Sequence, residues 1–585
     1  MYVLGIHDGH NASAALMKDG RIVAAVQEER PRGVKNALGM PWNAIDDVLS
    51  QADIKPQDVD FVALAGMHSG EYLKLDQSLN PSEQILTWHG QNYEKSWFDV
   101  KQAIRNVMPD SLYEWLKGDR IREMRLDMVT SLGFRREGIR LVEHHTAHAA
   151  SAYYGWGKLD EPILILTNDG MGDDICATVS IGENGKFTRI ASVPYTESVA
   201  EVYALTTYLM GMVPLEHEYK LMGMAPYASP RRADVVYSHL KDLVSFKGKG
   251  GMTWKRHSGM PPLGRAYHEL EKVYRRQRFD SICGGIQKFT EEFLKEWVTK
   301  AIRETGIRKV ALAGGIFMNV KANRLILELA EVDDLFIFPS CGDETNAIGA
   351  AYWITAEEMG KTGHPISIHP LQGLYWGRSF HDQESEDAIA AFNFSQRVKI
   401  ETPSNIERSV AQLLAQGRVV ARCAGRMEFG ARALGNRSIL GNPSDSRVIK
   451  IINEMIKQRD FWMPFAPSVA AEKVHTYLRK PKDVSSHYMT LTFESVPEKR
   501  EAFLAGIHPY DGTARPQEVL ASHNEPYHRL IQYFGELTGE EIILNTSFNL
   551  HGFPVVYTPH HALQTFDQSG LQCLALGPFL LTKSE

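Results

Sequence analysis

Short apolar runs separated by polar turns open the chain. Tyr2 to Ile6, Ala12 to Met17 and Arg21 to Val26 are mainly apolar, and Asp8-Gly9 and Lys18-Asp19-Gly20 lie between them. An Asp-Gly pair between two apolar runs is a strong signal for a hairpin. The pattern therefore predicts strand, loop, strand, turn and strand over the first 26 residues.

The same pattern returns around Asp169. Ile163 to Leu166, Cys176 to Ser180 and Phe187 to Ala191 are apolar, with Asp169-Gly170 and Asn184-Gly185 between them. A repeated hairpin of this kind predicts two similar α/β halves facing a cleft, whose backbone N–H groups can hold phosphate oxygens. The actin-like ATPase superfamily is built in this way. Two ordinary turns are the competing interpretation.

A third segment supports the duplicated fold. A strand is expected at Lys309 to Ala313, a helix at Val320 to Ala330, a strand at Leu335 to Phe338 and a helix at Asn346 to Met359. Gly314 and Gly315 let a backbone approach a nucleotide closely, and with Asn319 they are predicted to bind it. Asp343 lies at a strand-to-helix turn, where open α/β sheets bind ligands.

The chain is expected to form an α/β protein with two domains. The first covers residues 1–360, the linker 361–377 is rich in Gly, Pro and His, and the second covers 378–585. In the second, a helix is expected at Asn405 to Gln416 and strands at Val419 to Cys423, Ile542 to Leu544 and Phe579 to Lys583. Residues 68–135 and the basic segment 241–280 are predicted insertions in the first domain.

Composition narrows the class of protein. With 585 residues, 43% hydrophobic and 23% charged, the chain can bury large cores and is not disordered. A net charge of −7 disfavours a nucleic-acid partner. The five cysteines include no CxxC pair, which is typical of a reduced intracellular protein. No apolar run reaches about 18 residues, and charge follows the N-terminus too soon for a signal peptide, so no membrane partner and a cytoplasmic location are expected.

A pair of histidines on one predicted helix is a candidate metal site. His144 and His148 lie four residues apart and so share a face, and Asp169 and Asp343 can complete the ligand set. Two nitrogens plus carboxylates suit a divalent ion such as Fe(II). The sequence is not HExxH, which argues against a zinc peptidase. Two hydrogen-bonded core histidines are the alternative.

Arginines and glycines alternate in the second predicted domain. The arginines within this stretch are Arg422, Arg426, Arg432, Arg437 and Arg447. Guanidinium groups on a glycine-rich loop suit a phosphate or a carboxyl-phosphate, whereas a solvated basic face is the alternative. His10, in the first hairpin loop, is a candidate general base, although a lone loop histidine is more often structural.

Nine short sequence motifs, in order along the chain, resemble those of the nodulation-type O-carbamoyltransferase family, which includes enzymes that carbamoylate antibiotics. The motifs begin at His10, Gln27, His144, Lys220, Ala313, Gly430, Pro464, Arg515 and Asn545. Three of them are Gln27-Glu-Glu-Arg30, Gly430-Ala-Arg-Ala-Leu-Gly-Asn-Arg-Ser438 and Asn545-Thr-Ser-Phe-Asn549. The nine motifs span residues 10–549, nearly the whole chain. Met463 stands where the antibiotic relatives have arginine, and Arg459 is a candidate replacement.

The resemblance implies an actin-like first domain and a YrdC-like second domain. It also implies that carbamoyl phosphate and ATP give carbamoyl-adenylate, whose carbamoyl group passes to a hydroxyl of a small-molecule natural product or sugar near an iron ion. His10 falls on the catalytic histidine, and His144, His148, Asp169 and Asp343 on the metal site. The positions that hold carbamoyl phosphate and nucleotide are Lys35, Arg432, Lys457, Asn545 and Ser547, and Arg437 is added from the arginine loop.

Three alternatives stay open at this point. An actin-like ATPase or sugar kinase explains the repeated loops but leaves the His pair and the arginines unused. A nucleotide-sensing scaffold gives no reason for His10, and a tRNA-modifying role conflicts with the net charge. The basic segment is either a solvated face or a site for an anionic acceptor. The acceptor is not identified, and a homodimer is left open.

Overall fold

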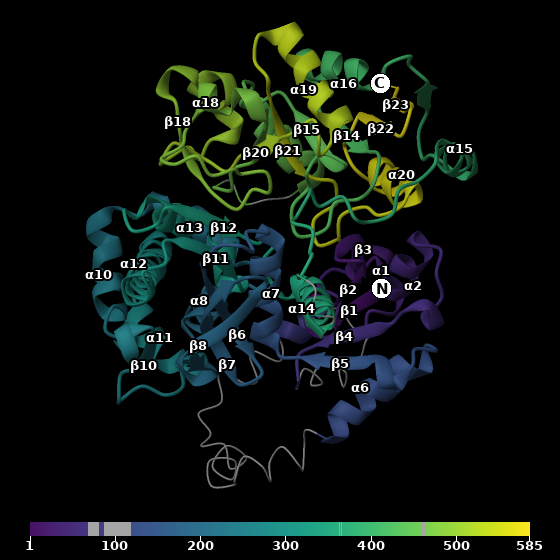
Figure 1. Ribbon diagram of the computed structural model, residues 1–585. Coiled ribbons are helices and arrows are strands. Elements are labelled where there is room, and N and C mark those ends of the chain that lie inside the picture. Colours follow the sequence, from purple (N-terminus) through teal and green to yellow (C-terminus); the bar gives the residue numbers. More distant parts are fainter. Residues whose placement is uncertain are drawn as a thin grey trace.

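Two five-stranded sheets of the same topology form the N-terminal part of the protein (Figure 1). The computed structural model describes residues 1–67, 81–86, 119–361, 363, 365–457, 460 and 462–584. The first sheet has the order β3-β2-β1-β4-β5 and the second the order β8-β7-β6-β11-β12. The first sheet's strands are β1 (Tyr2–His7), β2 (Ser13–Lys18), β3 (Arg21–Gln27), β4 (Phe61–Ala65) and β5 (Ile139–Val142). The second sheet's strands are β6 (Ile163–Gly172), β7 (Ile175–Glu183), β8 (Lys186–Pro194), β11 (Lys309–Ala313) and β12 (Asp334–Ile337).

The pairing pattern is also the same in both sheets. In each, the first strand pairs antiparallel with the second and parallel with the fourth, and the fourth pairs parallel with the fifth. The predicted duplicated α/β fold is therefore confirmed. Asp8-Gly9 lies between β1 and β2 as predicted, whereas Asp169-Gly170 lies within the irregular end of β6, and the turn to β7 falls at Asp173-Asp174.

Helices α7 (His144–Trp156) and α14 (Asn346–Lys361) lie between the two sheets (Figure 1). Their closest contact is between two small, buried residues, because Gly349 of α14 lies against Ala147 of α7. A Cβ atom added at Gly349 would lie 1.9 Å from the Ala147 carbonyl oxygen. The two backbones therefore approach more closely than any other residue at position 349 would allow.

The remaining helices surround these sheets. Around the first sheet lie α1 (Glu29–Arg32), α2 (Trp42–Gln51) and α6 (Asp119–Ser131), and around the second lie α8 (Val199–Leu209), α9 (Glu218–Met224), α10 (Pro230–Leu240), α11 (Tyr267–Tyr274), α12 (Phe279–Thr305) and α13 (Val320–Glu328). Most of the predicted insertion at 68–135 lies outside the described residues. The basic segment forms β9 (Val244–Lys247), β10 (Thr253–Arg256) and α11, and its Trp254 and Tyr274 are buried in the core.

An eight-stranded mixed sheet forms the C-terminal part. Its order is β13-β23-β22-β14-β15-β21-β16-β20. The strands are β13 (Val398–Glu401), β14 (Val420–Cys423), β15 (Arg437–Gly441), β16 (Ala466–Ala470), β20 (Gln517–Val519), β21 (Ile542–Ser547), β22 (Cys573–Leu576) and β23 (Phe579–Lys583). A small sheet of β17 (Leu478–Arg479), β18 (Phe493–Ser495) and β19 (Thr513–Ala514) lies beside it.

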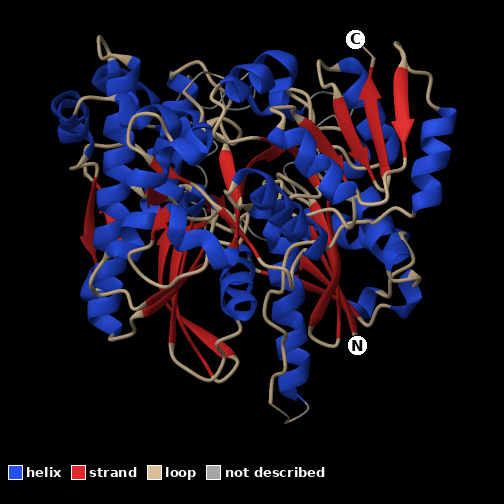
Figure 2. Cartoon of the chain, turned by 90° about the horizontal axis from the view of Figure 1, so that it is seen from above, coloured by secondary structure: helices blue, strands red, loops and turns tan. Residues whose placement is uncertain are grey.

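Both faces of the large sheet are covered. Val420 packs in one core with α16 (Ile406–Ala415) and α19 (Glu525–Thr538), and Ala421 packs in another with α17 (Arg447–Ile452) and α20 (Pro559–Gln568). Successive residues of a strand point to opposite faces, so these cores lie on the two sides. Helices α15 (Asp382–Ala391) and α18 (Val474–Tyr477) complete this part. Viewed from above, the strands gather in groups with helices between them (Figure 2). Among the described helices, none is long and apolar enough to cross a membrane.

We expect Gly349→Ala to destabilise the protein, because the added methyl group would overlap a backbone oxygen. Overpacking of this kind costs about 1–3 kcal/mol. Gly360→Ala is the matched control on the same helix, since its Cβ would meet only the Ile366 side chain at 4.0 Å. There the better helix propensity of Ala should add about 0.5–1 kcal/mol. Denaturant midpoints of the two variants measure the difference, and equal midpoints would contradict the close approach of α7 and α14.

Candidate functional site

Helix α7 begins with the two histidines of the predicted metal site. Its N-cap is Glu143, whose carboxylate accepts hydrogen bonds from the backbone N–H groups of His145 and Thr146. His144 and His148 lie on the helix face that meets the Asp169 and Asp343 loops. His145 points elsewhere, because its Nδ1 contacts Thr167 Oγ1 at 2.8 Å and its Nε2 contacts the Ile175 carbonyl oxygen at 3.1 Å.

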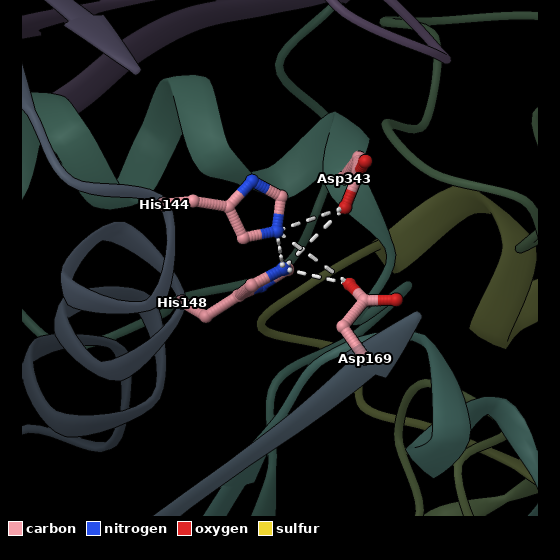
Figure 3. A group of neighbouring side chains, drawn as sticks. All are labelled: His144, His148, Asp169 and Asp343. Carbon is pink, nitrogen blue, oxygen red and sulfur yellow. Dashed lines mark hydrogen bonds and ion pairs between the residues drawn. The ribbon is translucent and has the colours of Figure 1, made fainter. Parts of the chain in front are cut away.

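The structure brings together the four residues His144, His148, Asp169 and Asp343 (Figure 3). One ligand atom from each lies within 4.8 Å of all the others. The Nε2 atoms of the two histidines are 3.1 Å apart, and His148 Nε2 lies 3.0 Å from Asp169 Oδ2. Asp343 Oδ1 lies 3.5 Å from both Nε2 atoms.

These distances fit four ligands around one ion. With metal–ligand bonds of about 2.0–2.2 Å, neighbouring ligand atoms are about 3 Å apart and opposite ones about 4 Å. Both histidines are buried and both carboxylates half-buried, so little water competes for the position between them. Two imidazoles and two carboxylates form the set preferred by divalent transition metals such as Fe(II), not a closed thiolate site.

Electrostatics also favours a cation here. Burial by itself lowers the pKa of His144, but the carboxylates of Asp343 and Asp169 outweigh burial and raise this pKa to about 9. Burial would raise the pKa of Asp169, but hydrogen bonds to His144 and His148 hold it well below its usual value. The side-chain amide of Asn346 lies 3.4 Å from His144 Nδ1. The amide nitrogen, Nδ2, is the atom that faces the rings, and it also lies 3.3 Å from His148 Nε2, so Asn346 contacts both imidazoles.

His10 lies in the loop after β1, as expected. It is buried, and its Nε2 has no hydrogen-bond partner among the described residues. Burial lowers its pKa, and the charges of Asp343 and Asp169 oppose this effect in part. The imidazole is therefore neutral at neutral pH and close enough to the metal-site carboxylates to sense their charge.

Sequence reasoning missed His7 as a member of the site. His7 Nε2 donates to the His10 carbonyl oxygen at 3.0 Å and lies 3.9 Å from Asp343 Oδ2. Burial lowers its pKa to about 4. The available signal was its position as the last residue of the central strand β1, at the sheet edge where ligands bind.

Two further carboxylates that the sequence analysis left aside hold the loops in place. Asp8 forms a fully buried, bidentate ion pair with Arg125 of α6, at 2.7 and 2.8 Å. Arg125 also donates to the carbonyl oxygens of Ala65 and Gly66, so it links the ends of β1 and β4. Asp173 accepts from the backbone N–H of Met67 and of His144 at 2.8 Å. It thus fixes the start of α7.

The nucleotide-binding residues predicted in the second half of the N-terminal part follow β11. Gly315 lies beside the metal site, since a Cβ there would be 3.0 Å from Asp169 Oδ1, and Gly314 packs on the Asn168 backbone. The Asn319 side chain caps α13 by accepting from Ala322 N–H, and it exchanges two hydrogen bonds with Gln287. The Asn319 side chain is therefore hydrogen-bonded within the protein and stabilises the loop between β11 and α13.

In the C-terminal part Asn545 contacts the residue that follows Arg432. The Asn545 amide donates to the carbonyl oxygen of Ala433, next to Arg432, at 3.0 Å, and its Oδ1 finds no partner in the described part of the chain. Arg437 is fully buried and donates to backbone carbonyls, including that of Ala424 at 2.9 Å. Ser547 Oγ donates to Asn549 Oδ1. The Lys457 side chain and Arg459 lie outside the described residues.

Lys35 and Met463 contact groups that the sequence did not suggest. Lys35 forms an ion pair with Glu216, which also accepts from Ser82 Oγ at 2.7 Å and Asn36 Nδ2 at 3.1 Å. The Met463 sulfur packs against Gly223 of α9. In the described structure the Lys35 ammonium is therefore paired with a carboxylate, and Met463 supplies an apolar contact in place of a cation.

Comparisons with known proteins agree with this geometry. The sequence profile described as Carbamoyltransferase N-terminus matches residues 2–352, and the one described as Carbamoyltransferase C-terminus matches residues 411–583. The nodulation protein NolNO of Sinorhizobium fredii is 29% identical over 98% of this chain and 79% of its own length. The nodulation protein NolO of Bradyrhizobium diazoefficiens is 30% identical over 76% of this chain and 79% of its own length.

Solved structures are more distant. Full-length HypF in its phosphate- and nucleotide-bound form matches with a TM-score of 0.33 and 13% identity, over 61% of this chain and 55% of that one. The 2-hydroxyisocaproyl-CoA dehydratase activator of Clostridium difficile with bound ADPNP gives a TM-score of 0.32 and 12% identity, over 63% of this chain and all of that one.

We expect Asp343→Asn to weaken divalent-metal binding at least about tenfold, because it removes one of the four charged or basic ligands. Glu344→Gln is the matched control: Glu344 is the next residue, is buried, and is not among the four ligands. Titration with Co(II), followed by its visible absorption, compares both variants with the native protein. Equal affinity in all three proteins would show that the cluster holds no metal.

Proposed function

This chain belongs to the carbamoyltransferase family, and on that premise we propose that it uses carbamoyl phosphate and ATP to carbamoylate a hydroxyl group of a small-molecule natural product or sugar. The observation that carries the proposal is the meeting of two loops. The Gly430–Arg437 loop of the C-terminal part lies on the loop that contains Asp343, since the Ala431 N–H donates to Ser340 Oγ at 2.8 Å. An activating site and a transfer site would thus be neighbours.

A balanced reaction has three steps. Water cleaves the P–O bond of carbamoyl phosphate and gives carbamate and phosphate. A carbamate oxygen then attacks the α-phosphorus of ATP and displaces pyrophosphate, which leaves carbamoyl-adenylate. Finally the acceptor hydroxyl attacks the carbamoyl carbon, its proton goes to a base, and AMP leaves. Activation is needed because nitrogen donates into the carbonyl group and makes a free carbamoyl group a poor electrophile.

Residues of the C-terminal part would bind the reactants of the first two steps. Arg432 offers a planar guanidinium that can pair with a phosphate through two parallel hydrogen bonds. Asn545 adjoins it through the Ala433 carbonyl and retains an unpartnered amide oxygen, within the described residues, for a donor such as the carbamoyl NH₂. The role of Lys457 rests on the family resemblance alone.

Residues of the N-terminal part would carry out the transfer. The neutral imidazole of His10 can accept the proton of the acceptor hydroxyl, and it lies beside the carboxylates of Asp169 and Asp343. A divalent ion held by His144, His148, Asp169 and Asp343 would supply positive charge to offset the phosphate of the leaving AMP. Lys35 lies in the segment whose backbone pairs with the His10 loop, and its ammonium could exchange Glu216 for an adenylate phosphate.

We expect carbamoyl-phosphate-dependent release of pyrophosphate and AMP, and a decrease of about 10²–10³-fold in Arg432→Ala, the effect of losing one donor to a developing charge. Arg408→Ala is the control, since Arg408 is an exposed arginine of α16 that pairs with Glu536. ³¹P NMR of mixtures with ATP and carbamoyl phosphate measures the products. Formation of ADP without regard to carbamoyl phosphate would contradict the proposal and favour an actin-like kinase.

A further inference from the structure

One of the nine sequence motifs named above has no role in the proposed reaction. Gln27-Glu-Glu-Arg30 runs from the end of β3 into α1, in the N-terminal part. Gln27 is 6% and Arg30 5% exposed, so both polar side chains are removed from water. In Figure 1, β3 and α1 face the loops of the C-terminal part. Buried polar groups of this kind need partners. Arg30 pairs with the neighbouring Glu29 at 3.1 Å, and both Gln27 and Arg30 also bind a residue in the other part of the chain.

Gln27 and Arg30 together bind both backbone groups of Gly430. The Gly430 N–H donates to Gln27 Oε1 at 3.2 Å, and Arg30 Nη2 donates to the Gly430 carbonyl oxygen at 2.9 Å. Arg30 Nη2 also donates to Gln27 Oε1 at 3.2 Å, which holds the two side chains against each other. Gly430 is the first residue of the loop that carries Arg432.

Ser340 completes this contact from the second half of the N-terminal part. Its Oγ accepts from Ala431 N–H and donates to Glu344, next to Asp343. Ser340 has φ 53° and Gly430 has φ 100°, so both backbones are in the left-handed region. A Cβ on Gly430 would lie 2.6 Å from the Ser340 Cβ. Strain of this kind persists where the surrounding structure fixes a functional geometry.

We infer that Gln27, Arg30 and Ser340 form an interdomain clasp on Gly430 and Ala431, which keeps the Arg432 loop on the Asp343 loop while the activated carbamoyl group passes between them. The inference rests on the proposed function. Carbamoyl-adenylate reacts with water to give carbamate and AMP, so a loop that lifts would lose the intermediate. The three residues are positioning residues: each holds the loop by its backbone, and none needs to touch the substrate.

If the clasp retains carbamoyl-adenylate, breaking it should speed hydrolysis of this intermediate without slowing its formation. In the absence of any acceptor, with ATP and carbamoyl phosphate alone, the native enzyme should release about one pyrophosphate per chain and then turn over slowly. Gln27→Met removes the shared acceptor of Arg30 and Gly430, and Ser340→Ala removes the bond to Ala431. Each variant should keep the initial burst and raise the later steady rate at least about tenfold. Rapid-quench measurement of pyrophosphate separates the two phases.

Two matched variants distinguish the clasp from general weakening of the interface. Gln27→Glu keeps an oxygen that accepts both hydrogen bonds, and it should behave as the native enzyme does. Arg324→Met breaks another contact between the two parts, the ion pair of α13 with Glu494 at 2.8 Å, and should leave both phases unchanged. A leak in Arg324→Met equal to that of Gln27→Met would overturn the inference.

Other outcomes also decide the question. An unchanged steady rate in Gln27→Met, or loss of its burst, would refute a clasp that retains the intermediate. If the native enzyme released no pyrophosphate with carbamoyl phosphate, the proposed function would fail. Amide hydrogen exchange of residues 428–434 then tests the clasp itself. Exchange should be faster in Gln27→Met than in Gln27→Glu, and equal exchange would exclude the clasp.

Discussion

The close approach of helices α7 and α14 is the constraint on which the rest of the structure depends. At Gly349 the α14 backbone lies against the Ala147 carbonyl, an approach that a Cβ atom at this position would prevent. The histidines of the candidate metal site lie on α7, and Asp343 begins the short turn, Asp343–Thr345, that leads into α14. A wider separation of the helices would move Asp343 away from the imidazoles, so the alanine-rich composition of both helices is a requirement of the chemistry as well as of packing.

Charged groups around the site are already paired before any substrate arrives. Arg125 holds Asp8 in a fully buried ion pair that also ties the ends of β1 and β4. Asp173 holds the first N–H of α7. Removing one partner of a buried pair leaves an uncompensated charge, which is costly, so these contacts fix the loops of His7, His10 and His144. Preorganised loops need little reorganisation during reaction.

The proposed reaction would explain why two parts of one chain meet at these loops. A carbamoyl group must be activated before transfer, and the activated form is lost when water reaches it. Gly430 and Ala431 lie directly on Gln27, Arg30 and Ser340, which would shorten the path between the two proposed half-reactions. The contact uses the backbone groups of Gly430 and Ala431, so it constrains the loop that carries Arg432.

Local pattern in the sequence determined the elements: both hairpins, the strand and helix around Gly314 and the face shared by His144 and His148 follow from periodicities of two and 3.6 residues. It also proposed Asp169 and Asp343, because strand ends and glycines mark ligand-binding turns. Tertiary structure alone decided that their oxygens converge with the two Nε2 atoms, that Arg125 binds Asp8 and that Gln27 meets Gly430. Such pairings depend on strand order and helix separation. A single arginine or glutamine has the same local sequence pattern whether its partner is water or a distant backbone group, so the sequence cannot distinguish the two cases.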